Sequence, residues 1–240
     1  MYSDIFCKVY NEFGWNYYPE AFGEQLLQWI RENGISVRSA MDLACGTGIL
    51  CQMLFDAGVE AAGMDFSPGM IEIARQNNPN IHYDVADMIT YCPQRQYDLV
   101  TCTGDALNHI LDLENVEKIF ANVYRYLAPG GYFVFDILNE HEVHPGEPFD
   151  LDFSETVRAT FQITRDEKGL IGLNTVVYEN GIKQFHEVIT EIVHDPDVIC
   201  QMLRRQGFRV LRRDNSLSGR EENRGTTWYI IAQKEKERIS

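Results

Sequence analysis

The feature that most constrains the fold is a repeated alternation of short apolar runs with amphipathic stretches over the first 140 residues. Five runs have the length and composition of buried strands: Ser39–Ala44, Val59–Asp65, Ile81–Val85, Tyr97–Cys102 and Gly131–Ile137. Helical stretches lie between them, at Gly48–Ala57, Pro68–Gln76 and Val116–Leu127. Strands separated by helices of this length predict βαβ units, and hence an α/β fold with a doubly wound, mostly parallel sheet.

The alternation stops at residue 139, where an acidic, loop-like stretch begins (NEHEVHPGEPFDLDFSE). Residues 153–194 then alternate apolar and polar side chains around the turn signals DEKG and ENG, which predicts a three-stranded antiparallel insert. Asp195 and Pro196 have the residue types of an N-cap and a first-turn proline, so the last helix should begin there.

Two closing strands, Phe208–Arg213 and Thr226–Gln233, follow that helix. We therefore predict one α/β domain from residues 1–138 and 195–240, which includes a helical N-terminal leader. Residues 139–194 form an acidic loop and a β insert that we expect to contact the substrate or a second subunit, so a homodimer is one expectation.

The composition narrows the class of partner. A net charge of −15 repels polyanions and disfavours nucleic acid as a substrate, although five arginines between residues 204 and 213 leave that option open. No run approaches the ~18 apolar residues that span a bilayer, and the start lacks a basic and apolar secretory signal. Six scattered cysteines are typical of small buried hydrophobes in a reducing compartment, so we expect a cytoplasmic protein with no membrane partner.

Acidic residues recur where the predicted parallel strands end. Asp42 lies near the end of the first strand, Asp65 ends the second, Asp87 follows the third, and Asp105 and Asp136 accompany the fourth and fifth. Open parallel sheets bind ligands beyond the carboxyl ends of their strands. Carboxylates there favour a ligand with positive charge and with hydroxyls or amines to donate, and they disfavour a pyrophosphate.

The first strand-to-helix turn carries Gly46 and Gly48 but has Cys51 where a dinucleotide-binding G-x-G-x-x-G motif would place its third glycine. Alone, two glycines are a weak signal. Asp42 four residues before Gly46, and Asp65 seventeen residues after Gly48, make the joint pattern much more specific. An acid at the end of the second strand suits the two hydroxyls of a ribose.

Five segments occur in the order and spacing of a known family: DLACGTG, GMDFSPGMIEIAR, ADM, YDLVTCTGDALNHI and LAPGGYFVFDI. They resemble the motifs of class I S-adenosylmethionine-dependent methyltransferases, strongly over residues 37–138. The resemblance implies a Rossmann-like sheet of seven strands, the last antiparallel, with S-adenosylmethionine as cofactor. It also implies methyl transfer to a nitrogen or oxygen of a small molecule, and the insert resembles that of N-methyltransferases acting on amino sugars.

The resemblance also assigns the methionyl half of the cofactor site. Ala44, Gly46 and Gly48 would let the backbone approach the methionyl group, with Asp42 near its ammonium. Tyr10, in the aromatic leader, resembles the family's lid tyrosine that reaches the cofactor carboxylate.

The nucleoside half is assigned in the same way. Asp65 would hold the ribose hydroxyls, Phe66 and Met70 would pack near the adenine, and Asp87 would accept from the adenine amine beside the backbone of Met88. An ordinary helix cap or loop acid is the competing interpretation of both aspartates.

The reaction itself asks mainly that two reactants be positioned in line. If a base is needed, the candidates are His109 first, then Asp105 and His186. Thr103, directly after the fourth strand, joins the cofactor-binding set. His141 and His144, in HEVH, have the spacing of metal ligands, but a proline and a glycine follow and no helical pattern supports them, so we expect no metal.

Two other functions remain open at this point. A catalytically silent cofactor-binding or dimerising module would show the same motifs. A nicotinamide-dependent oxidoreductase would use the same sheet, but its pyrophosphate would meet Asp42.

Overall fold

A computed structural model describes residues 7, 10–11, 14–140, 143–217 and 227–235. Most of the predicted leader, together with His141 and Thr226, lies outside the described residues.

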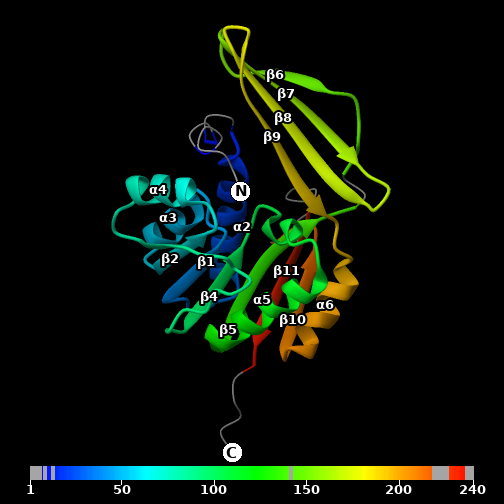
Figure 1. The fold of residues 1–240 in the computed structure, drawn as a ribbon. Coiled ribbons are helices and arrows are strands. Elements are labelled where there is room, and N and C mark those ends of the chain that lie inside the picture. The colour runs from blue at the N-terminus through cyan, green and yellow to red at the C-terminus, as the bar shows by residue number, and fades with distance from the viewer. Residues whose placement is uncertain (1–6, 8–9, 12–13, 141–142, 218–226, 236–240) are drawn as a thin grey trace, which may run out of the picture.

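Seven strands form the main sheet, in the order β10-β11-β5-β4-β1-β2-β3 (Figure 1). Their bounds are β1 (Ser39–Leu43), β2 (Glu60–Asp65), β3 (His82–Val85), β4 (Tyr97–Cys102), β5 (Leu127–Leu138), β10 (Phe208–Asp214) and β11 (Thr227–Lys234). Strands β1 to β5 pair in parallel, whereas β11 runs antiparallel to both β5 and β10. The predicted seven-stranded, mostly parallel sheet with an antiparallel last strand is confirmed.

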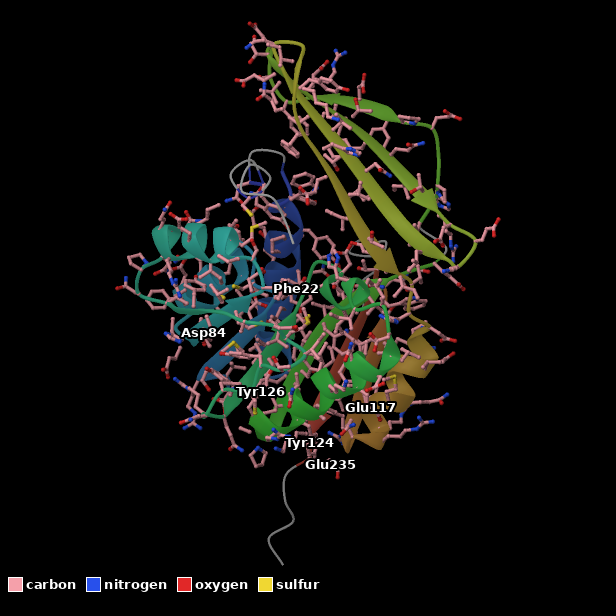
Figure 2. The ribbon with its side chains drawn as sticks, in the orientation of Figure 1. Phe22, Asp84, Glu117, Tyr124, Tyr126 and Glu235 are labelled. Carbon is pink, nitrogen blue, oxygen red and sulfur yellow. The ribbon has the colours of Figure 1, made fainter. Side chains whose placement is uncertain are left out.

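Helices cover both faces of this sheet. They are α2 (Tyr17–Glu32), α3 (Ile49–Asp56), α4 (Pro68–Asn77), α5 (Leu113–Tyr126), α6 (Pro196–Arg205) and the 3₁₀ helix η1 (Ala106–His109). The apolar sides of α2, α3 and α4 pack on one face, and those of α5 and α6 pack on the other. Figure 2 shows Phe22 and Tyr126 pointing into these two layers, while Glu117 on α5 is exposed.

Helix α5 begins three residues before the predicted start. Asp112 caps it by accepting a hydrogen bond from the backbone N–H of Asn115 at 2.8 Å. The first turn carries the exposed Leu113, so the apolar periodicity that predicts the helix begins only at Val116.

The insert is a separate antiparallel sheet of four strands in the order β6-β7-β8-β9. Three of them lie within residues 153–194, where three strands were predicted, and the fourth, β6, precedes that range and was not predicted. The strands are β6 (Phe149–Asp152), β7 (Val157–Arg165), β8 (Leu170–Glu179) and β9 (Ile182–Ile192). The extra strand, β6, is short, exposed and half acidic, so its sequence is typical of a loop. Arg158 on β7 forms ion pairs with Asp150 and Asp152, which holds this edge strand in place.

The insert stands over the end of the main sheet at which β1 to β5 finish (Figure 1). Its inner face packs on the main domain through Ala159, Phe161, Val177 and Phe185, which form one hydrophobic cluster with Met70 of α4. This contact fixes the strand β9 over the carboxyl ends of the parallel strands. No helix among the described residues has the length and apolar character needed to cross a membrane.

Candidate functional site

The turn between β1 and α3 has an unusual backbone. Ala44, Gly46 and Gly48 all have positive φ, at 55°, 53° and 83°, and for a residue with a Cβ this conformation is uncommon. A Cβ added to Gly46 would meet no atom within 4 Å, so Gly46 faces open space. A Cβ on Gly48 would lie 2.6 Å from the hydroxyl of Tyr83, so Gly48 serves close packing inside the fold.

Asp65 ends β2 and ties two loops together. Its Oδ2 accepts from the backbone N–H of Gly46 at 2.9 Å, and its Oδ1 accepts from that of Ser67 at 2.8 Å. Burial raises the pKa of this carboxyl, and the backbone hydrogen bonds oppose that shift. Two carboxylate oxygens offer about four acceptor positions, so Asp65 retains capacity for the hydroxyls of a ligand.

Asp42, on β1, is only 1 % exposed. Thr101 Oγ1 of β4 donates to its Oδ1 at 2.7 Å. The pKa of Asp42 is raised to about 7, chiefly by burial and in smaller part by the nearby Asp65 and Asp136, while the hydrogen bond from Thr101 opposes the shift. A cationic group beside Asp42 would restore its ionised form.

Asp136, at the end of β5, organises the loop after β4 from inside the protein. Its carboxylate accepts from the side chains of Tyr18 and Thr103 and from the backbone N–H groups of Gly104 and Asp105. Of the strand-end acids, this one is fully occupied by the fold.

Behind that loop, three titratable side chains gather between η1 and β9. Nε2 of His109 lies 3.5 Å from Oε1 of Glu191, and His109 also forms a hydrogen bond with the backbone of Thr190. Asp105 completes the group, and the ligand atoms of Asp105, His109 and Glu191 all lie within 4.8 Å of one another. Such a cluster has the donor set of a cation site or of a proton-transfer group.

Burial is the main influence on the pKa values of this cluster. Burial, with the nearby charges of Glu191 and Asp136, raises the pKa of Asp105 well above its ordinary value. Burial raises the pKa of Glu191 to about 7 and lowers that of His109. At neutral pH the imidazole is therefore uncharged, and the carboxyls hold protons readily.

A cavity of ≈ 480 Å³ lies between the carboxyl ends of the strands and β9. The predicted residues that line it are Tyr10, Asp42, Ala44, Gly46, Asp65, Phe66, Met70, Asp87, Met88, Thr103 and His109. Three predicted residues are not in the lining: Gly48 packs on Tyr83, Asp105 belongs to the cluster with His109, and His186 is exposed on β9.

Sequence reasoning missed the contribution of β9, whose residues Glu187 to Thr190 line the cavity and whose Glu191 meets His109. The sequence of β9 does contain a pattern that could have indicated this contribution. Glu187 and Glu191 alternate with Phe185 and Ile189 on one side of the strand, so that side carries two acids among apolar residues. The five arginines between residues 204 and 213 contribute nothing to the lining.

Residues 40–131 match a family model described as "Methyltransferase domain". The chain therefore contains a methyltransferase domain, as its motifs predict. It is 26% identical to "Putative methyltransferase YqeM" of Bacillus subtilis (strain 168), over 98% of each chain. It is 27% identical to the dTDP-4-amino-2,3,4,6-tetradeoxy-D-glucose N,N-dimethyltransferase of Saccharopolyspora spinosa, over 56% of this chain and 53% of that one. The methyltransferase thus spans about half the length of that amino-sugar relative.

The fold comparison agrees with this assignment. The S-adenosylmethionine-bound structure of CalS10, an amino pentose methyltransferase from Micromonospora echinaspora, superposes with a TM-score of 0.75 over 98% of both chains at 18% identity, which shows a shared fold. The site has room for a ligand, because Gly46 faces open space and the buried carboxyls of Asp42 and Asp65 line the same cavity.

Proposed function

We propose that this methyltransferase moves the methyl group of S-adenosylmethionine to an amine nitrogen of a small polar acceptor of the amino-sugar kind. The observation that carries the proposal is one cavity lined by strand-end carboxylates and also by the neutral imidazole of His109. The Saccharopolyspora relative, named as an N,N-dimethyltransferase, supports nitrogen as the acceptor atom.

The strand-end residues would hold the cofactor. Asp42 suits its ammonium, Asp65 its ribose hydroxyls, and Asp87 the adenine amine, while the half-exposed Phe66 offers a ring at the cavity edge. Gly46 and Ala44 bring the backbone close to the methionyl part. When bound, S-adenosylmethionine supplies a methyl group on a sulfonium, which is already activated for transfer.

Positioning and proton removal remain for the protein. The lone pair of the acceptor nitrogen forms the new bond to the methyl carbon, the carbon–sulfur bond breaks, and its electron pair stays on sulfur. Holding the two reactants in line supplies much of the rate enhancement, of order 7–11 kcal/mol for well-oriented groups. The nitrogen then carries a proton to be removed, and the neutral His109, with Glu191 at 3.5 Å, accepts it.

The test compares two histidine variants. His109→Gln should lower kcat about 100-fold, because it removes the proton acceptor from the cavity wall. His186→Gln is the matched control, since His186 is exposed on β9 and outside the lining, and its kcat should not change. Equal kcat for H109Q and wild type would overturn the role of His109. Calorimetry that detects no binding of S-adenosylmethionine or S-adenosylhomocysteine, or detects binding of NAD instead, would overturn the proposal as a whole.

We also propose that the protein forms a homodimer through the edge of the insert. Strand β6 is a free edge of the four-stranded sheet among the described residues, and its Phe149 and Leu151 are about half exposed. An unpaired edge strand with apolar side chains is suited to pairing with a second copy. Sedimentation equilibrium should give twice the chain mass, and a monomer at all concentrations would refute this.

A further inference from the structure

The charged side chains of the cavity lining are acidic. Among the described residues, four carboxylates line it, on Asp42, Asp65, Asp87 and Glu187, and no lysine or arginine does. The imidazole of His109 is uncharged at neutral pH because burial lowers its pKa. A concave wall of one sign concentrates the opposite charge, so this cavity attracts cations and repels anions.

Three of the four carboxylates have partners in the cofactor under the proposed function. The fourth, Glu187, lies on β9 of the insert, two residues from Ile189 and four from Glu191. Side chains two apart in a strand share a face, so Glu187 belongs to the inner side of the strand, which packs on the main domain. The insert therefore adds one carboxylate to the cavity lining, beyond the three assigned to the cofactor.

Asp105 and Glu191 stand beside His109. Burial raises the pKa of both carboxyls, and the nearby charges of Glu191 and Asp136 raise that of Asp105 further, so both take up protons readily near neutral pH. A diphosphate entering the cavity would meet the four lining carboxylates, and within the described part of the chain no lysine or arginine lines the cavity to receive it. Phosphate groups in proteins are usually received by arginine, lysine or backbone N–H groups.

We propose that Glu187 is a specificity-determining residue that binds the amine of the acceptor, and that the acceptor is a free cationic amine without a phosphate. This inference rests on the proposed function, and it separates this methyltransferase from the Saccharopolyspora relative, whose named acceptor is a dTDP-linked sugar. The acceptor enters as an ammonium held by Glu187. One N–H bond breaks before the attack, its proton leaves to water, and the electron pair stays on nitrogen as the attacking lone pair. After the methyl transfer, His109 accepts the proton that the methylated nitrogen releases.

The test uses one amino sugar in two forms. The probes are dTDP-4-amino-2,3,4,6-tetradeoxy-D-glucose and the free sugar 4-amino-2,3,4,6-tetradeoxy-D-glucose, offered to the enzyme loaded with S-adenosylhomocysteine in calorimetry and to the S-adenosylmethionine enzyme in a methyl-transfer assay. We expect the free sugar to bind at least tenfold more tightly and to be methylated with the higher kcat/KM. A preference for the dTDP form, or no preference, overturns the inference.

Variants assign the effect to Glu187. Glu187→Gln should raise KM for the free sugar about tenfold and bring the two forms closer in affinity, because the amide keeps the shape and loses the charge. Glu179→Gln removes the same charge from an exposed position on β8 and should leave both values unchanged. An equal effect of the two variants would show that only the overall charge matters and would overturn the role of Glu187.

The same calorimetry distinguishes a failure of the proposed function from a failure of the phosphate-free acceptor alone. If S-adenosylmethionine fails to bind, the proposed function falls. If it binds normally while the dTDP sugar is preferred, the proposed function stands and only the choice of a phosphate-free acceptor is overturned.

Discussion

Replacing Asp42 with Asn should stabilise the protein and weaken cofactor binding at the same time. The carboxyl is buried, and its pKa is raised from 3.8 to about 7. A carboxyl with a raised folded-state pKa favours folding fully below its unfolded pKa, and that stability is lost as the pH rises through about 7. A pKa raised this far lowers the free energy of unfolding by about 4 kcal/mol at pH 8, but by only about 1.5 kcal/mol at pH 5.

The amide in Asp42→Asn imitates the protonated carboxyl and can still accept from Thr101 Oγ1. The variant should therefore exceed the wild type in stability by about 4 kcal/mol at pH 8, and this advantage should shrink by about 2.5 kcal/mol at pH 5. Loss of the charge facing the cofactor ammonium should weaken S-adenosylhomocysteine binding by about 10- to 100-fold.

Urea denaturation at both pH values measures the stability difference, and calorimetry measures the affinity. Glu72→Gln, at an exposed position on α4, is the control for loss of one negative charge, and its stability should stay within ~0.5 kcal/mol of the wild type. If Asp42→Asn is less stable than the wild type at pH 8, or if its advantage does not change with pH, the reasoning about a buried and destabilised carboxylate is wrong.

Three further predictions concern the cofactor turn and one helix. Asp65→Ala should lower S-adenosylhomocysteine affinity at least ~10-fold with an unchanged circular dichroism spectrum, and unchanged affinity would contradict the ribose assignment. Gly48→Ala should lower the free energy of unfolding, measured by urea denaturation, by at least ~1 kcal/mol more than Gly58→Ala does. Both glycines have φ near 85°, but only a Cβ at Gly48 would clash with the Tyr83 hydroxyl. Equal losses of stability would refute this clash. Asp112→Ala should remove the cap of α5 and cost about 1 kcal/mol, while cofactor affinity stays constant in calorimetry.

The main domain could be predicted from sequence because its signals are local. Apart from β3, the parallel strands are short, largely apolar runs. Helix start signals accompany them, such as Ser67 before Pro68 in α4. The insert was predicted less well. Strand β6 alternates apolar residues with aspartates, and what makes it a strand is pairing with β7 and the ion pairs of Arg158, which are not local in sequence.

The residues of the candidate site also fall into those that could be predicted from sequence and those that depend on tertiary packing. Asp42, Asp65 and Asp87 could be predicted because parallel strands end at one edge of a sheet, so sequence position determines their neighbourhood. Glu191 and Glu187 could not, because the place of Glu191 beside His109 and of Glu187 in the cavity lining depends on how the insert packs on the main domain. The role of Asp136 was likewise hidden, since only the structure shows that four donors occupy its carboxylate.

The buried carboxyls of the site also explain why a cation is the ligand that the fold favours. Burial raises the pKa of Asp42, Asp65, Asp105, Asp136 and Glu191, so each ionised form costs free energy in the protein without ligand. A ligand with positive charge lowers this cost, and an anion increases it. The same residues that make the free protein less stable thus favour S-adenosylmethionine, with its sulfonium and ammonium, and then a cationic acceptor beside it. Neutral S-adenosylhomocysteine lacks the sulfonium charge, so the acidic cavity should hold it less tightly, which favours release of the spent cofactor after each transfer.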